Sequence, residues 1–134
     1  DWVSPNNNQI SDGIFATSTN LCTGAFRENS VEIIKGGNIT GTNQSTGAAL
    51  PTTEAFITYG GSSNLWGTTW TSSDVNASNF GIGFSVRHTT SGADFVTHYL
   101  TATNFGFSIP AGATITGIQV DVQQKTITSG TICP

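Results

Sequence analysis

A strict alternation of apolar residues with small or polar residues over residues 79–87 is the feature that most constrains the fold of this chain. Successive side chains of a β-strand point to opposite faces, so a period of two places one set in a core and the other in water. The same alternation returns over residues 104–110 and 117–123. These segments predict three strands, each with one buried face. The apolar residues concerned are Phe80, Ile82, Phe84, Val86, Phe105, Phe107, Ile109, Ile118, Val120 and Val122.

Weaker alternation, bounded by turn residues, predicts five further strands over residues 13–17, 30–35, 38–42, 54–60 and 93–101. Gly36 and Gly37 separate two of these segments and suit a tight hairpin turn. A short turn of helix is expected within residues 69–78, with Ser72 and Ser73 as capping residues. Eight or so short strands separated by turn signals are typical of an all-β fold. We therefore predict a single domain over residues 1–134, an antiparallel β-sandwich of the jelly-roll or immunoglobulin-like kind.

The composition decides which partners suit such a fold. Thr, Ser, Asn and Gly (22, 14, 11 and 16 residues) make up nearly half of the 134 residues, whereas only 12 residues are charged. These residue types are common on exposed strands and in turns. A net charge of −4 with four cations excludes the basic surface that binds nucleic acid. No apolar run reaches the roughly 18 residues that span a bilayer, so we expect no membrane span. The polar, weakly charged composition favours an extracellular, cell-surface or virion-surface protein.

The chain has two cysteines, Cys22 and Cys133. An even number of cysteines in a chain suited to an oxidising exterior favours a disulfide between them. Such a bridge would close a loop of roughly 110 residues and would stabilise the fold by about 4–5 kcal/mol on the chain-entropy model. The alternative is a pair of unpaired, buried thiols.

No residue pattern predicts catalysis or a bound metal ion. His88 and His98 are the only histidines, and Asp94, which lies between them in the sequence, could approach either. The chain contains no Gly-x-Ser-x-Gly elbow, no Cys-x-x-Cys and no His-x-x-x-His. Residues 74–78 carry oxygen atoms at alternate positions, as a calcium loop does, but the glycine and terminal glutamate of that loop are missing. We expect a protein that is not an enzyme and that needs no metal or other cofactor.

Tyr59, Trp66 and Trp70 lie close together in the sequence around a loop rich in glycine and serine. Exposed on a sheet, such rings could stack against sugar rings, as the flat aromatic faces of carbohydrate-binding modules do. In the other interpretation, which we favour, Trp66 and Trp70 plug the end of the sandwich or an intersubunit contact.

Three sequons for N-glycosylation begin at Asn38, Asn43 and Asn76. Sequons arise readily by chance in a chain this rich in Asn, Thr and Ser, so glycan attachment is a hypothesis for each site. Glycans, as attached groups or as ligands, are therefore candidate partners.

Seven segments taken together resemble a known family: residues 2–7, 12–17, 35–37, 59–67, 74–81, 102–110 and 113–120. They are similar to an uncharacterised β-sandwich repeat found in bacterial surface, filament and phage structural proteins. The resemblance covers most of the chain. It implies a β-sandwich for which no catalytic residues are established.

The order of these segments departs from the family. The Ala-Thr-Asn-Phe-Gly-Phe block at residues 102–107 comes last here, whereas in the family it follows the block equivalent to residues 12–17 and precedes the Lys-Gly-Gly hairpin. This departure leaves three explanations: a different connectivity, an element exchanged between neighbouring subunits, or an unsettled segment order.

Together these observations predict a non-catalytic structural subunit of an extracellular filament or fibre. It would associate with copies of itself into a homopolymer through an edge strand or an exchanged terminal segment. The alternative is a carbohydrate-binding or adhesive module of a surface or phage tail protein, with Tyr59, Trp66 and Trp70 as its aromatic platform.

Overall fold

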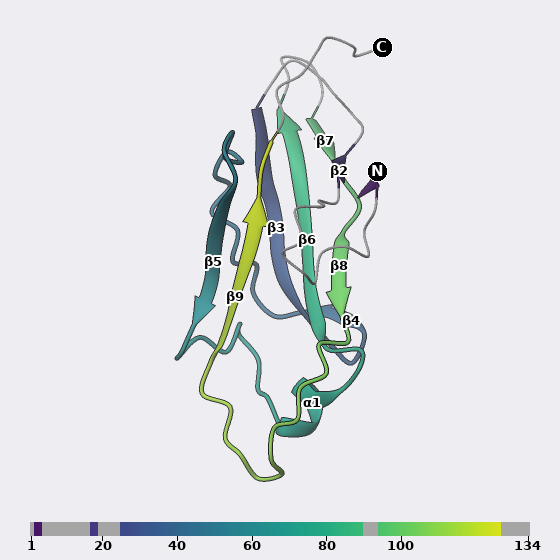
Figure 1. Cartoon of the computed structure of the whole chain (residues 1–134), viewed down its shortest axis with the longest axis vertical. Coiled ribbons are helices and arrows are strands. Elements are labelled where there is room, and N and C mark those ends of the chain that lie inside the picture. Colours follow the sequence, from purple (N-terminus) through teal and green to yellow (C-terminus); the bar gives the residue numbers. More distant parts are fainter. Residues whose placement is uncertain (1, 4–16, 19–24, 90–93, 127–134) are drawn as a thin grey trace.

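A computed structural model describes residues 2–3, 17–18, 25–89 and 94–126 (Figure 1). Over these residues the chain is mostly antiparallel β-structure with one short helix, which confirms the all-β, antiparallel part of the predicted fold class. The elements are β1 (Trp2–Val3), β2 (Thr17–Ser18), β3 (Ala25–Lys35), β4 (Asn38–Thr40), β5 (Ala55–Gly61), α1 (Ser72–Asn76), β6 (Gly81–Thr89), β7 (Asp94–Val96), β8 (Leu100–Thr103) and β9 (Ile118–Gln124).

The larger sheet has five strands, in the order β4-β3-β6-β7, with β8 also paired to β6. β3 and β6 are its long central pair, with Val31 opposite Phe84 and Ile33 opposite Ile82. Because β3 occupies one edge of β6, the shorter strands β7 and β8 follow one another along the other edge. Both long strands are therefore interior strands of the sheet.

The second edge of β3 is covered along most of its length. β4 pairs with the end of β3 through the Gly36–Gly37 hairpin, whose glycines have φ of 60° and 82°. Residues 42–50 then run beside the rest of β3, with backbone bonds of 2.9 Å from Gln44 N to Val31 O and from Leu50 N to Phe26 O. This irregular segment satisfies backbone groups that would otherwise be exposed at a sheet edge.

β5 and β9 form a separate antiparallel ribbon, from the pair Ala55–Gln124 to the pair Gly61–Ile118 (Figure 1). Even-numbered residues of β9 face the larger sheet, and Val120 and Val122 pack against the core. The core lies between this ribbon and the larger sheet. Its buried members include Val31, Ile33, Trp66, Phe80, Ile82, Phe84 and Val86.

Most of the predicted elements are confirmed. The segments predicted over residues 30–35, 38–42, 54–60, 79–87 and 117–123 correspond to β3, β4, β5, β6 and β9. The segment 93–101 instead forms parts of two strands, β7 and β8. The short helix is present as α1, but its cap is Thr71, which accepts a 3.2 Å hydrogen bond from Asp74 N, rather than Ser72 or Ser73. Of the segment 13–17, only Thr17 lies within the described residues.

The strand predicted over residues 104–110 is wrong. Asn104 and Gly106 have φ of 61° and 70°, in the left-handed region, so the backbone cannot keep the pleat of a strand. The alternating aromatic residues are used differently, because Phe105 and Phe107 stack on one another with centroids 5.8 Å apart. The alternation therefore reflects an apolar contact made by a loop and not a hydrogen-bonded ladder.

Candidate functional site

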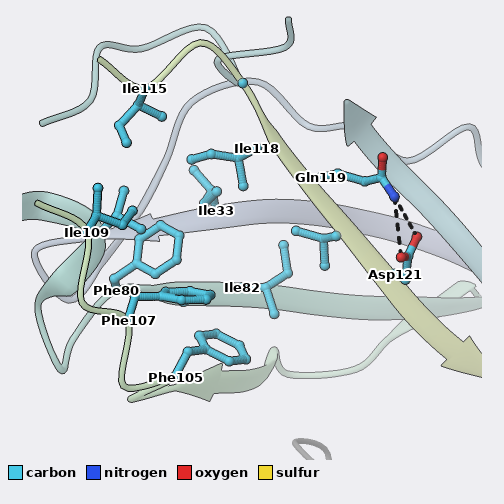
Figure 2. A pocket seen from close by; sticks show the side chains of 14 residues that line it. Ile33, Phe80, Ile82, Phe105, Phe107, Ile109, Ile115, Ile118, Gln119 and Asp121 are labelled. Carbon is cyan, nitrogen blue, oxygen red and sulfur yellow. Dashed lines mark hydrogen bonds between the residues drawn. The ribbon is translucent and has the colours of Figure 1, made fainter. Parts of the chain in front are cut away.

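An open groove of about 390 Å³ lies between β9 and the connecting segment 104–117, beside the ends of β3, β6 and α1 (Figure 2). Its lining is apolar except where β9 contributes Gln119 and Asp121. Figure 2 shows aromatic rings on one side of the groove and aliphatic side chains on the other. The principal apolar residues are Ile33, Phe80, Ile82, Phe105, Phe107 and Ile118.

An aromatic wall connects this groove with the core. Phe80 is buried and meets Trp70 edge to face, with centroids 5.5 Å apart. Phe105 and Phe107 lie 6.4 and 6.1 Å from Phe80 and are 41% and 47% exposed. Aromatic pairs at these separations are stabilising. The wall is thus anchored in the core by Phe80 while its outer two rings face solvent.

Helix α1 fixes the segment that carries the outer rings. The side chain of Asn76, the last residue of α1, forms two hydrogen bonds with the backbone of Ile109. Asn76 Nδ2 donates to Ile109 O at 2.9 Å, and Ile109 N donates to Asn76 Oδ1 at 2.8 Å. This pair of bonds holds the segment 104–117 at the end of the molecule where α1 lies (Figure 1).

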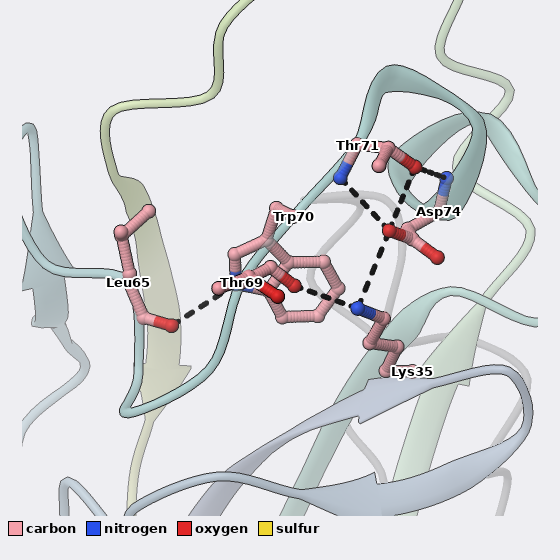
Figure 3. A network of polar contacts seen from close by, with 6 residues as sticks. All are labelled: Lys35, Leu65, Thr69, Trp70, Thr71 and Asp74. Carbon is pink, nitrogen blue, oxygen red and sulfur yellow. Dashed lines mark hydrogen bonds and ion pairs between the residues drawn. The ribbon is translucent and has the colours of Figure 1, made fainter.

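A network of polar contacts fixes α1 in turn (Figure 3). The Asp74 carboxylate accepts hydrogen bonds from Thr71 N at 2.8 Å and from Thr71 Oγ1 at 2.7 Å, which completes a capping box. Lys35 Nζ lies 3.3 Å from Asp74 Oδ2, donates to Thr69 O at 2.6 Å and stands 5.2 Å from the centre of the Trp70 ring. The Thr71 bonds, with a smaller contribution from Lys35, lower the pKa of Asp74. Of the oxygens proposed for a calcium loop, Asp74 Oδ2 therefore serves the helix cap and Asn76 Oδ1 accepts a hydrogen bond from Ile109 N.

The direction of the β9 backbone defines the other wall of the groove. Ile118 N donates to Asn64 O at 2.9 Å, and Ile118 O accepts a 2.9 Å bond from Trp66 Nε1. At the other end, Thr126 N donates to Pro51 O at 2.7 Å. All three bonds point toward the β5 side. Because backbone direction alternates along a strand, the even-numbered residues of β9 address β5 and the odd-numbered residues address the opposite edge.

Gln119 and Asp121 therefore direct their N–H and C=O groups to the groove side of β9. Among the described residues, no backbone group pairs with these two residues on that side. Their side chains are exposed and contact each other, with Gln119 Nε2 3.3 Å from Asp121 Oδ2. The sequence predicted the strand but gave no sign of which of its edges would be open.

The three aromatics proposed as a sugar platform are buried. Tyr59, Trp66 and Trp70 are 4%, 0% and 8% exposed. The Trp66 indole supports the ribbon through Ile118 O, and Trp70 Nε1 donates to Leu65 O at 3.0 Å. These rings offer no flat exposed face to a sugar. Trp66 and Trp70 are therefore core residues, which leaves the favoured interpretation, that they plug the end of a sandwich or an intersubunit contact, as a prediction.

Tyr59 belongs to a buried polar cluster that the sequence did not indicate. Glu28 is 3% exposed and accepts hydrogen bonds from the Tyr59 hydroxyl and from Thr46 N, the latter at 3.1 Å. Gln124 Nε2 donates to the Tyr59 oxygen at 2.5 Å. Burial, followed by the bond to Glu28, raises the pKa of Tyr59. The cluster joins β3, β5, β9 and the segment beside β3, so its role is to fix these elements together.

The histidines show no arrangement typical of catalysis. His88 is buried, and its ring lies 4.7 Å from the ring of Phe26. His98 is exposed in the short link between β7 and β8, and the backbone of Asp94 pairs with Thr89. Among the described residues, no group of three or more His, Cys, Asp or Glu side chains could hold a metal ion.

The sequon asparagines differ in how their side chains are used. Asn38 is exposed at the hairpin, and its amide donates only to the nearby Gly36 O, at 3.2 Å. The Asn43 oxygen accepts a 2.9 Å bond from Val31 N and so helps to cover the edge of β3. The Asn76 side chain forms the two hydrogen bonds with the Ile109 backbone that are described above. Asn38 is thus the sequon whose side chain has the least structural role.

Cys22 and Cys133 both lie outside the described residues, as does most of the N-terminal segment. In the part of the chain that is described, no helix has the length and apolar character needed to cross a membrane. Comparison with protein-family models, with curated proteins and with solved structures finds no match for this chain.

Proposed function

We propose that the chain is a non-catalytic structural subunit of an extracellular filament or fibre, which assembles through edge-strand or terminal-segment contacts. The observation that carries this proposal is the apolar groove beside β9, with its exposed rings Phe105 and Phe107, where no described backbone group pairs with Gln119 or Asp121. Soluble proteins normally protect such edges with prolines, bulges or covering segments. Gln119 and Asp121 have no such cover among the described residues, and the β5–β9 ladder is regular.

We further infer that the two layers form one β-sandwich domain, whose smaller layer has two strands among the described residues. Two strands of the ribbon face five strands of the larger sheet. Large apolar side chains on and next to β7 and β8 are exposed. Phe95 on β7 is 53% exposed, and Phe105 and Phe107, which follow β8, are 41% and 47% exposed. Grouped exposed apolar side chains commonly mark an interaction surface.

The remaining features are consistent with an exterior setting. The low charge and polar surface suit an extracellular or cell-surface protein, Cys22 and Cys133 would pair there, and a glycan would be placed most readily at Asn38. The carbohydrate-binding alternative depended on Tyr59, Trp66 and Trp70. Their burial removes that support, so self-assembly is the function we propose.

Sedimentation velocity over a wide range of protein concentration, followed by electron microscopy of negatively stained samples, tests this function. We expect species of increasing size and elongated particles of uniform width. A single monomeric species at every concentration, with no elongated particles, would overturn the proposal.

A further inference from the structure

Two of the four cationic side chains of the chain lie directly opposite one another on the larger sheet. Arg27 on β3 pairs with Arg87 on β6, so both side chains lie on the same face of the sheet. That face is turned away from the core, because the preceding residues, Phe26 and Val86, contact the core. Val96 on β7, which pairs with Arg87, is 57% exposed. Solvent therefore reaches this face beside the two arginines.

Both guanidinium groups lie beside the same residue, Gly47, in the segment that covers the edge of β3. Arg27 Nη1 donates a 3.2 Å hydrogen bond to Gly47 O. A Cβ atom at Gly47 would lie 3.2 Å from Arg87 Nη2, so the Arg87 side chain reaches across β3 to the same loop. The fold therefore concentrates two positive charges at one place on a weakly charged chain.

No carboxylate among the described residues forms an ion pair with either arginine. The ion pair found in this part of the chain joins Lys35 and Asp74. Like charges directly opposite each other on neighbouring strands destabilise a sheet. In addition, Arg87 Nε is buried and has no hydrogen-bond partner among the described residues. A buried donor without an acceptor is costly, so the pair lacks both a negative charge and hydrogen-bond acceptors.

We propose that Arg27 and Arg87 together form a binding site for one small oxyanion, a phosphate, sulfate or carboxylate group. A guanidinium presents several N–H donors in one plane, which match the spacing of the oxygens in such groups. Two guanidinium groups side by side can share one anion. The bound anion would cancel the repulsion between the arginines and supply acceptors that the Arg87 guanidinium lacks. This site does not depend on the fibre function proposed above.

The charge of the chain restricts the ligand to a single anionic group. The net charge is −4, and these two arginines are half of the cations. Of the other two, Lys35 is engaged with Asp74. A nucleic acid or another polyanion requires a row of basic side chains along its length. A pair of arginines on a chain of negative net charge instead suits an isolated anion.

NMR spectra of the arginine Nε–Hε groups in the full chain test the site. Inorganic phosphate, sulfate and acetate are titrated separately at constant ionic strength, with chloride as the reference salt, because screening alone would otherwise alter the spectra. We expect saturable shifts of the Arg27 and Arg87 signals with at least one of the three anions. The anion that binds most tightly identifies the group that the site accepts. Absence of shifts, or shifts that increase without saturation for all three anions, would overturn the proposal.

A matched pair of variants separates this site from the general charge of the surface. Arg27→Gln and Lys125→Gln each remove one positive charge, and Lys125 is an exposed residue directly after β9, in the other layer. We expect Arg27→Gln to weaken binding of the tightest anion by at least about tenfold, and Lys125→Gln to leave the affinity unchanged. Equal losses in the two variants would show a general effect of charge and reject the site. Circular dichroism establishes that each variant is folded.

Arg27→Lys tests the role of the guanidinium shape and remains available if Arg27→Gln does not fold. It keeps the positive charge but loses the planar arrangement of donors. The variant should therefore also bind the anion more weakly than the parent does. Unchanged affinity would show that a point charge suffices, which contradicts a shared, paired contact.

Thermal unfolding gives an independent measurement. A ligand that binds only the folded chain raises its melting temperature in proportion to the logarithm of ligand excess. We expect the tightest anion to raise the melting temperature of the parent and of Lys125→Gln, but not that of Arg27→Gln. An equal rise in all three proteins would reflect a general salt effect and count against the site. A protein that stays monomeric but binds the anion would reject the fibre function and retain this site.

Discussion

β3 and β9 are both long strands that contribute to the same core, but their edges are treated differently. β3 has β6 on one edge, and β4 with the segment 42–50 on the other. β9 has β5 on one edge, and no described backbone group pairs with Gln119 or Asp121 on the other. The cover of β3 is irregular in conformation, which shows that an edge can be closed without a regular strand.

The polar side chains follow the same division. Buried Glu28 and the amide of Asn43 attach the segment 42–50 to β3, whereas the open side of β9 faces apolar rings. Buried contacts therefore fix the cover of β3, whereas exposed apolar rings, which suit association, lie beside β9. Substitutions of buried residues should lower the free energy of unfolding, and substitutions of the exposed rings should change it little.

The largest loss of stability, measured as the free energy of unfolding, is expected for Trp66→Ala. Trp66 is fully buried, and its indole holds the ribbon at Ile118 O. Loss of a buried tryptophan should lower the free energy of unfolding by about 3–5 kcal/mol. Phe95→Ala, at a half-exposed ring on β7, is the control and should cost less than about 1 kcal/mol. Urea denaturation measures both, and similar values for the two variants would contradict the assigned core.

Glu28→Gln tests the cover of β3 and should have an intermediate effect. The Glu28 carboxylate accepts bonds from Tyr59 and Thr46, and a glutamine amide would place a donor against these donors. We expect the free energy of unfolding to fall by about 2–3 kcal/mol and hydrogen exchange to become faster at Gln44 N and Leu50 N. Glu32→Gln, at a half-buried carboxylate bonded to Tyr99, is the control. Unchanged exchange in the segment 42–50 would show that Glu28 does not hold it.

The alternating pattern of the sequence was sufficient to locate the long strands. Period-two apolar residues become buried wherever a strand has one face toward a core, so β6 and β9 could be found from local pattern alone. The hairpin at Gly36 and Gly37 was equally local. The same rule failed over residues 104–110, because Asn104 and Gly106 adopt left-handed conformations that the side-chain pattern does not record.

The candidate site was less accessible from the sequence, because it depends on contacts between distant residues. The sequence shows that Tyr59, Trp66 and Trp70 are close together, which suits both an exposed sugar platform and a buried plug. Their burial depends on how the β5–β9 ribbon packs. The partners of the β9 backbone depend on which strands pair, and the sequence does not specify pairing. Glu28 precedes the strand predicted over residues 30–35, and the β-bulge between Glu28 and Ser30 changes which side chains face inward.

The smallest change in stability is expected for Asp74→Asn, which tests the contribution of the Asp74 charge to the cap of α1. Hydrogen bonds from Thr71, then the nearby Lys35, hold the pKa of Asp74 below its ordinary value of 3.8. The ionised carboxylate therefore stabilises the fold above that pH, and this contribution is lost as the pH falls through the lower pKa of the folded state. The melting temperature of Asp74→Asn should be slightly below that of the parent at pH 7, and the difference should disappear in acid. In a Thr71→Ala background the same substitution should have less effect, because the main bonding partner is already absent. A difference in melting temperature that stays constant from neutral to acid pH would mean that the charge of Asp74 contributes nothing to stability.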